Sequence, residues 1–330
     1  MAVEIFHESE IRDSVTLHEA IEAMEDAFVA YANKAATVPS VIHLDIPADR
    51  GEIHIKAAHM HSAPEYVVKI AAGFYNNREK GLPVGSGMML VFDSRNGFPK
   101  AILIDNSHLT DVRTAAAGGV AAKYMACKKI ERVGIIGAGV QGRLQMEALA
   151  CVRDFKTVLI YDHHATNIVR YREEMAGRVP VEMIAARTPE DAVRGCQVVI
   201  TATPSREPII KAEWLDPGTH ITALGSDGAD KQELEVGVLQ RADRIVADSL
   251  QQCAKFGEIH HALEAGVLRE SDVDGELGEV VLGKISGRNS EDEITVCDLT
   301  GVGVQDAAIA ALAYRKLTTK SPSSKRIHKD

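Results

Sequence analysis

The sequence lacks the features of a membrane protein and of a nucleic-acid-binding protein. Its 330 residues contain no stretch of about 18 uncharged apolar residues, and the first ten, MAVEIFHESE, carry acids where a secretory signal has a basic start and an apolar run. Positive charge is in deficit, because 37 Lys and Arg stand against 47 Asp and Glu, a formal net charge of −10. Such a surface repels phosphate backbones and anionic lipids, so we expect neither nucleic acid nor a membrane as a partner.

Cysteine is scarce and scattered. The five cysteines are an odd number, lie far apart and form no CxxC pair. Neither a disulfide framework nor a zinc site is indicated, and we expect a reducing, cytoplasmic environment. His54, His59 and His61 are close in sequence, but strand alternation turns His54 away from the other two and no acidic residue stands beside them. We therefore expect no metal ion.

The residues that are present are typical of a globular protein. Hydrophobic residues make up 45% and charged residues 25% of the chain, and its length favours two domains. From Leu17 to Tyr31, apolar residues recur every three or four positions, which predicts an amphipathic helix. Short β-rich runs divided by turn signals, between Val38 and Leu103, predict an antiparallel sheet, and an Ala- and Gly-rich helix is expected over Thr110–Met125.

A second pattern begins at Arg132. Six short apolar strands alternate with helical stretches; they are RVGIIG, KTVLIYD, VEMIAA, CQVVITAT, GTHITALG and DRIVAD. This alternation predicts an α/β fold with a doubly wound parallel sheet. The helical run from Gln305 to Leu317 is expected to return to the first domain, which would then be discontinuous.

A glycine-rich turn follows the first of these strands. Gly137, Gly139 and Gly142 satisfy GxGxxG between a strand and a helix, and the next strand ends at Asp162, 20 residues after Gly142. In a dinucleotide site, these glycines permit the tight turn, the approach of the diphosphate to the backbone, and close packing of helix on strand. Asp162 would accept hydrogen bonds from the ribose and repel a 2′-phosphate, which favours NAD(H). The alternative is a plain strand-to-helix turn with Asp162 as a helix cap.

Several motifs resemble one family. They are VPSVIHL, Lys69 in YVVKIAAGF, DNSHLTDVRTAAAGG from Asp105, GAGVQG, ALGSDGADKQEL from Ala223, and DLTGVG. In order and spacing, over Pro39–Asp306, they resemble the ornithine cyclodeaminase and μ-crystallin family. The resemblance implies an NAD(P)-dependent enzyme acting on amino acids and their imines. It also implies a homodimer whose substrate-binding and dimerisation domain spans 1–119 and 306–330, with a Rossmann NAD-binding domain over 120–305.

The resemblance also implies roles for particular residues. Lys69, Arg113 and Asp227 would line the reaction site, with Thr300 beside the substrate. The resemblance implies that the nucleotide is bound by Ser86, Arg113, Thr114, Gly137, Gly139, Val140, Gln141, Gly142, Asp162, Thr203, Lys231 and Leu299. It also implies contacts from Ile221–Leu224, in particular from Ala223 and Leu224. Asp227 can stabilise or protonate an imine nitrogen, and Lys69 and Arg113 can hold an α-carboxylate. Alternatively, Thr203 belongs to a plain loop, Arg113 is a surface charge and Asp227 forms a turn.

The sequence also departs from the family pattern. Members commonly carry an arginine just after the proline of the first strand, whereas here Pro39 is followed by SVIH. Ornithine-acting members carry an acid where this chain has Lys56. Lys56, Lys69 and Arg113 together favour a substrate with two carboxylates, and we expect NADH-dependent reduction of iminosuccinate to L-aspartate. The alternatives are an ornithine cyclodeaminase, an alanine dehydrogenase using NAD, and a small-ligand binding protein of the μ-crystallin type.

Overall fold

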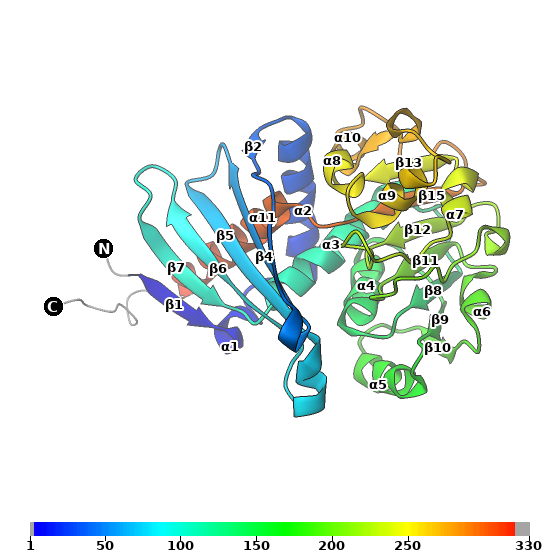
Figure 1. The fold of residues 1–330 in the computed structure, drawn as a ribbon, viewed down its shortest axis with the longest axis horizontal. Coiled ribbons are helices and arrows are strands. Elements are labelled where there is room, and N and C mark those ends of the chain that lie inside the picture. The colour runs from blue at the N-terminus through cyan, green and yellow to red at the C-terminus, as the bar shows by residue number, and fades with distance from the viewer. Residues whose placement is uncertain (1–2, 321–330) are drawn as a thin grey trace. The chain divides into compact units, whose positions relative to one another are not determined.

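The chain divides into two compact units. The computed structural model describes residues 3–320, and its contacts separate unit 1, residues 1–113 and 302–330, from unit 2, residues 114–301 (Figure 1). The sequence analysis had set the two boundaries after residues 119 and 305. Among residues 3–320, no helix combines the length and the apolar character that a membrane crossing requires.

Unit 1 is built on a seven-stranded sheet in the order β1-β7-β6-β5-β4-β2, with β3 paired to β4. The strands are β1 (Glu4–His7), β2 (Ala36–Thr37), β3 (Ile42–Ile46), β4 (Gly51–Met60), β5 (Glu65–Phe74), β6 (Gly85–Asp93) and β7 (Pro99–Ile104). The antiparallel sheet predicted between Val38 and Leu103 is confirmed from β3 to β7. β2, which precedes that range, also pairs with β4 in antiparallel fashion. β1, which the sequence analysis did not identify, pairs with β7 in parallel.

Helices cover one face of this sheet. They are α1 (Glu8–Ile11), α2 (Leu17–Ala32), the start of α3 (His108–Met125) and α11 (Gly303–Lys320), with 3-10 turns η1 (Pro47–Asp49) and η2 (Tyr75–Lys80). The helix predicted from Leu17 is confirmed, and the Thr16 side chain accepts a hydrogen bond from the Glu19 N–H at its start. α11 packs on α2, β4 and β5, so the last helix does return to the first sheet.

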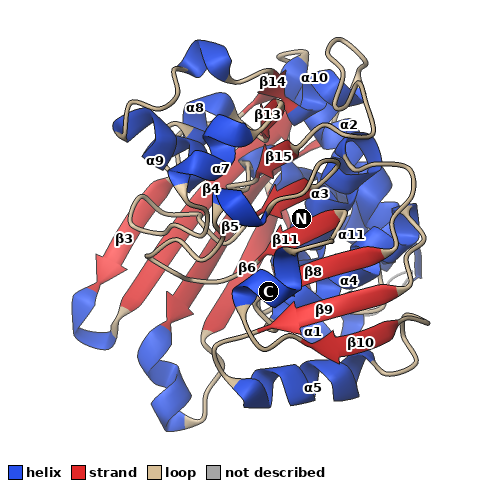
Figure 2. Ribbon diagram, turned by 90° about the vertical axis from the view of Figure 1, so that its right-hand side faces the viewer, coloured by secondary structure: helices blue, strands red, loops and turns tan. Residues whose placement is uncertain are grey.

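Unit 2 contains a parallel eight-stranded sheet in the order β10-β9-β8-β11-β12-β15-β13-β14, part of which Figure 2 shows. The strands are β8 (Arg132–Ile136), β9 (Thr157–Tyr161), β10 (Glu182–Ala185), β11 (Val198–Thr201), β12 (His220–Ala223), β13 (Arg244–Ala247), β14 (Gly275–Glu276) and β15 (Thr295–Asp298). The six predicted strands are β8 to β13. β15, which was not predicted, separates β12 from β13.

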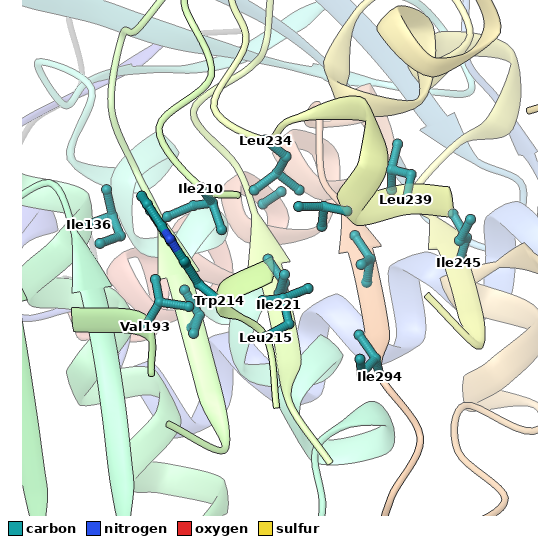
Figure 3. Packing of buried hydrophobic residues seen from close by; sticks show 14 of the residues in the cluster. Ile136, Val193, Ile210, Trp214, Leu215, Ile221, Leu234, Leu239, Ile245 and Ile294 are labelled. Carbon is teal, nitrogen blue, oxygen red and sulfur yellow. The ribbon is translucent and has the colours of Figure 1, made fainter. Parts of the chain in front are cut away.

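The helices of unit 2 pack on this sheet. They are α4 (Val140–Val152), α5 (Ala165–Met175), α6 (Pro189–Val193), α7 (Val236–Arg241), α8 (Leu250–Cys253), α9 (Gly257–Glu264) and α10 (Leu277–Val281), with 3-10 turns η3 (Ala212–Trp214) and η4 (Glu270–Asp272). The core contains the single tryptophan, and Figure 3 shows Trp214 among the side chains of Ile136, Val193 and Ile210. The sheet order places β8 between β9 and β11, which is the point where the order of winding reverses and where such folds bind ligands.

Candidate active site

The glycine-rich turn lies at this switch point. Gly137 has φ +103°, and a Cβ there would lie 2.6 Å from the Ala202 carbonyl oxygen. A Cβ at Gly142 would overlap the Gly137 carbonyl oxygen, so α4 packs on this turn only with glycine there. At Gly139, by contrast, a Cβ meets nothing within 4 Å, and no side chain caps the start of α4. The open backbone and the uncapped N–H groups of α4 fit the diphosphate of a dinucleotide.

Asp162 is held beside this turn. Its Oδ2 accepts a hydrogen bond from the Ala138 N–H at 2.9 Å, and its Oδ1 accepts from the His164 N–H at 2.8 Å and from Asn167 Nδ2 at 2.9 Å. The carboxylate therefore joins the glycine turn to the first turn of α5. Asp162 thus stabilises the start of α5, which is the structural role given above as the alternative. The same bonds place its carboxylate beside the glycine-rich turn, where a contact with the ribose requires it.

Two loops leave the neighbouring strand ends of β11 and β12. The first carries Thr203 and the second carries Gly225, and Glu233 accepts a hydrogen bond from the backbone N–H of each, at 2.6 and 2.9 Å. Ala223, the last residue of β12, and Leu224, which follows it, are buried, and the Leu224 N–H donates to the Thr201 carbonyl at 3.1 Å. Glu233 was not identified from the sequence.

Asp227 lies in the second of these loops. Its side chain is 51% exposed and forms a 2.7 Å ion pair with Lys231 Nζ. The Lys231 carbonyl oxygen in turn accepts from the Ser226 hydroxyl and lies 2.7 Å from His261 Nε2. The segment from Ser226 to Lys231 is thus a closed turn, so a turn-forming role for Asp227 and an exposed, reactive carboxylate are compatible.

Leu299 and Thr300 follow the end of β15. The Leu299 N–H donates to the Ala223 carbonyl at 2.9 Å, so these two predicted residues are adjacent. The Thr300 side chain is buried, donating to Asp248 Oδ1 at 3.1 Å and accepting from Gln252 Nε2 at 3.0 Å. These bonds give Thr300 a structural role in unit 2.

The remaining predicted residues differ in their surroundings. Val140 is exposed and Gln141 half-buried in the first turn of α4. Thr114 is half-buried in α3, and Ser86 is exposed in β6, where it pairs with Ala72.

Unit 1 contains a buried group of opposite charges. Lys69 Nζ lies 2.8 Å from Asp306 Oδ2, and Arg113 Nε donates to Asp306 Oδ1 at 3.0 Å. Arg113 Nη1 also donates to Gln305 Oε1 at 3.3 Å. Lys69, Arg113 and Asp306 are 3%, 6% and 1% exposed, so Arg113 is not a surface charge. Lys56 stands directly opposite Lys69 in the pairing of β4 with β5.

The electrostatics of this group depend on Asp306. Burial lowers the pKa of Lys69 to about 7; the charge of Asp306 opposes this shift, and those of Arg113 and Lys56 add to it. Burial also disfavours the ionised form of Asp306, but the cations Lys69, Arg113 and Lys56 outweigh it and lower its pKa. Two buried cations, Lys69 and Arg113, thus share the carboxylate of Asp306, and Lys56 is a third cation close to them.

Asp306 could have been sought from the sequence, because a lysine in an apolar strand needs an anion when it is buried. No sequence pattern connects Asp306 with Lys69, because the two residues are far apart in the chain. The sequence analysis used Asp306 only as a domain boundary. His43, in the strand that follows Pro39, pairs with His54 across β3 and β4 at a ring separation of 4.6 Å. Strand alternation puts His43 and His54 on the same face as Lys56.

The histidines close in sequence have other contacts. His59 Nε2 lies 3.2 Å from the Ala63 carbonyl oxygen, and His61 Nε2 lies 3.1 Å from Thr37 Oγ1. Among residues 3–320, the group near enough to hold a metal ion consists of His260, His261 and Glu264, on one side of α9. His261 Nε2 already lies 2.7 Å from the Lys231 carbonyl oxygen.

Comparison with known proteins identifies the family. The model of the ornithine cyclodeaminase/mu-crystallin family matches residues 2–321. An uncharacterized cyclodeaminase from Sinorhizobium fredii is 42% identical, covering 98% of both chains. The alanine dehydrogenase of Archaeoglobus fulgidus is 38% identical over 97% of both chains, and the iminosuccinate reductase of Paracoccus denitrificans is 36% identical over 92% of this chain and 93% of its own.

Solved structures share the fold. An archaeal alanine dehydrogenase dimer with bound NAD superposes with a TM-score of 0.92 and 37% identity, covering 98% of this chain and 99% of its own. The Delta(1)-pyrroline-2-carboxylate reductase of Thermococcus litoralis, in complex with NADH and L-proline, has a TM-score of 0.92 and 32% identity over 97% and 98% of the two chains.

Proposed function

This chain belongs to the ornithine cyclodeaminase/mu-crystallin family, and we propose that it reduces iminosuccinate to L-aspartate with NADH. It is an oxidoreductase that acts on amino or imino groups, as are the reductases and dehydrogenases to which it is similar. The observation that carries the choice of substrate is the buried group in which Lys69 and Arg113 share Asp306.

The group formed by Lys56, Lys69, Arg113 and Asp306 has a net positive charge, which suits an anionic ligand. Lys69 and Arg113 share the carboxylate of Asp306, and the buried acid Asp105 is within electrostatic range of Lys69. Lys56 adds positive potential at both Lys69 and Asp306, so the three cations outnumber the two acids. A buried cation without an anion is costly, and a substrate carboxylate supplies that anion. We assign the α-carboxylate to Lys69 and Arg113, and the second carboxylate to Lys56.

Unit 2 supports the assignment of the cofactor. The open approach at Gly139 and the uncapped start of α4 suit the diphosphate of NAD(H), and Asp162 disfavours a 2′-phosphate. When bound, the cofactor supplies the hydride that reduces the imine carbon. The iminosuccinate reductase among the relatives supports both the substrate and the reaction.

The protein's residues then prepare the substrate for that hydride. Lys69 and Arg113 fix the carbon that is reduced by holding its carboxylate. We assign to Asp227 the proton on the imine nitrogen, because an exposed carboxylate can exchange a proton with a substrate. Lys69, with a pKa of about 7, can also give or take a proton near neutral pH.

A panel of substrates tests this proposal. Purified protein should oxidise NADH fastest with oxaloacetate plus ammonia, which form iminosuccinate, and should produce L-aspartate in equal amount. Pyruvate plus ammonia, a cyclic ketimine, and NADPH in place of NADH are the comparisons. Faster turnover of the pyruvate imine would overturn the proposal in favour of an alanine dehydrogenase, which the 38% identical relative supports. Conversion of ornithine to proline without net NADH change would indicate a cyclodeaminase.

We also propose that the protein is a homodimer. The face of the first sheet opposite Lys69 is apolar and incompletely buried; it comprises Ile42, Leu44, Ile53, Ile55, Val68, Ile70, Met88, Leu90 and Ile102. Ile42 and Leu44 are 60% and 53% exposed, and a second copy of this face would cover them. Leu44→Lys should convert dimer to monomer in sedimentation velocity; an unchanged mass would contradict this interface.

A further inference from the structure

Glu233 is a buried acid in unit 2 to which no role has yet been given. It is 0% exposed, and its two carboxylate oxygens accept hydrogen bonds from two different loops. Oε1 accepts from the Thr203 N–H at 2.6 Å, and Oε2 accepts from the Gly225 N–H at 2.9 Å. These loops follow β11 and β12, at the carboxyl edge of the parallel sheet where ligands bind in this fold.

The loops are in close contact where Glu233 joins them. A Cβ at Gly225 would overlap the Thr203 carbonyl oxygen and lie 2.5 Å from Glu233 Oε2. The Thr203 loop in turn touches the glycine-rich turn, because a Cβ at Gly137 would lie 2.9 Å from Thr203 Cγ2. Glu233 therefore fixes the Thr203 loop between the glycine-rich turn and the loop that leads to Asp227.

Two further buried acids hold Glu233 in place. Glu258 accepts from the Glu233 N–H at 2.8 Å and from the Leu234 N–H at 3.0 Å. Asp298, at the end of β15, accepts from the Ile259 N–H at 2.9 Å and so anchors the start of α9, on which Glu258 lies. Three acids thus connect the end of β15 to the two loops.

Stability alone does not account for this arrangement. Burial raises the pKa of Glu233 to about 7, and raises that of Glu258, with the nearby Glu233 adding to the rise. Neighbouring buried acids are costly, and neutral or apolar side chains of similar size would often be less so. What a carboxylate adds is a pair of strong, directed bonds to two backbone N–H groups.

We propose that Glu233 is a positioning residue that fixes the Thr203 and Gly225 loops to hold the nicotinamide half of NADH. This rests on the proposed function, which places the dinucleotide on the glycine-rich turn. The adenosine diphosphate half then depends on the turn itself, on Asp162 and on the start of α4. Glu233 acts on the other half alone.

Paired binding measurements with Glu233→Gln test this assignment. The glutamine has the same shape, but its NH₂ cannot accept, so one loop N–H loses its partner. ADP-ribose, which lacks the nicotinamide ring, should bind with its Kd within about twofold of the unchanged protein, whereas the Kd for NADH should rise about tenfold. Glu207→Gln is the matched control, because Glu207 is an exposed acid in the loop after β11 and should alter neither Kd.

The outcomes separate the two proposals. If Glu233→Gln weakens both ligands equally, Glu233 has a general structural role; if it weakens neither, the loops do not depend on it. Either result overturns the inference alone. If the unchanged protein binds neither NADH nor ADP-ribose, the proposed function fails and the inference with it. If Glu233→Gln does not fold, Gly225→Ala is the second variant, because its Cβ would push the Gly225 loop away from the Thr203 carbonyl oxygen. It must weaken the binding of NADH and leave the binding of ADP-ribose unchanged.

Discussion

At the scale of single residues, Asp306 decides what Lys69 and Arg113 can do. The two cations lie 2.8 and 3.0 Å from its carboxylate oxygens, which allows both to be buried. Removing one member of such a group costs about 3–5 kcal/mol because it leaves an uncompensated buried charge. Sequence reasoning identified both cations but not the acid, because a contact between residues so far apart in the chain leaves no local pattern.

Lys56 is predicted to select the second carboxylate. Lys56→Gln should lower kcat/KM for iminosuccinate by about 10- to 100-fold, the loss expected for one charge-assisted hydrogen bond, with little change for the imine of pyruvate. Lys80→Gln removes the same charge from an exposed position and should leave both substrates unaffected. Equal losses for both substrates in the Lys56 variant would show that Lys56 does not discriminate between them.

Lys69 is predicted to weaken substrate binding at alkaline pH, and we call the pH at which KM begins to rise the alkaline limit. With a pKa of about 7, it loses its charge above that pH, so KM for L-aspartate in the oxidative direction should rise as pH increases through 7. Asp306 favours the charged form of Lys69, and Asp306→Asn should therefore move the pH at which KM begins to rise to a lower value. Asp49→Asn, an exposed acid in the same unit, is the control. A limit that does not move would exclude Lys69 as its source.

At the scale of elements, the sequence pattern was a good guide for the helix with a regular apolar spacing and for the strands that alternate with helical stretches. The helix predicted over Leu17–Tyr31 and the six strands from β8 to β13 are present. The strands that were missed, β1, β2, β14 and β15, have 4, 2, 2 and 4 residues. The two-residue strands are too short to show a periodicity, and β15 follows a charged SEDE segment that resembles a loop. Length alone does not explain the difference, because β10 to β13 also have four residues each.

The glycine-rich element offers a matched pair of substitutions. In Gly142→Ala the new Cβ would overlap the Gly137 carbonyl oxygen, so α4 must move and Tm should fall by several degrees. In Gly139→Ala the Cβ meets no protein atom within 4 Å, so Tm should stay nearly constant while the Kd for NADH rises at least about tenfold. If Gly139→Ala binds NADH as tightly as the unchanged protein does, the diphosphate does not lie against this turn.

At the scale of the whole molecule, buried titratable groups determine how stability depends on pH. Burial lowers the pKa of His220 to about 3, and its ring nitrogens lie 2.8 Å from Thr295 Oγ1 and 3.1 Å from Thr222 Oγ1. Between about pH 6.5 and 3 the unfolded chain binds a proton that the folded one does not. Burial raises the pKa of Asp298 to about 8, so between its usual pKa and pH 8 the folded chain binds a proton that the unfolded chain does not. Asp298 therefore lowers the free energy of unfolding as pH increases toward 8.

His220 is therefore predicted to destabilise the protein in acid. As pH falls below about 6.5, it should lower the free energy of unfolding by up to about 1.4 kcal/mol per pH unit. His220→Gln should be less stable than the unchanged protein at pH 7, and this difference should shrink by pH 5. Urea unfolding at pH 7, 6 and 5 checks this, and a difference independent of pH would contradict it.

The central claim is that Lys56, Lys69 and Arg113 hold both carboxylates of an imine that NADH reduces. A crystal structure with NAD⁺ and L-aspartate tests it most directly. We expect the diphosphate at Gly137–Gly142, one carboxylate on Lys69 and Arg113, and the other on Lys56. A dinucleotide bound elsewhere, or an aspartate whose carboxylates face away from these three side chains, would contradict the account.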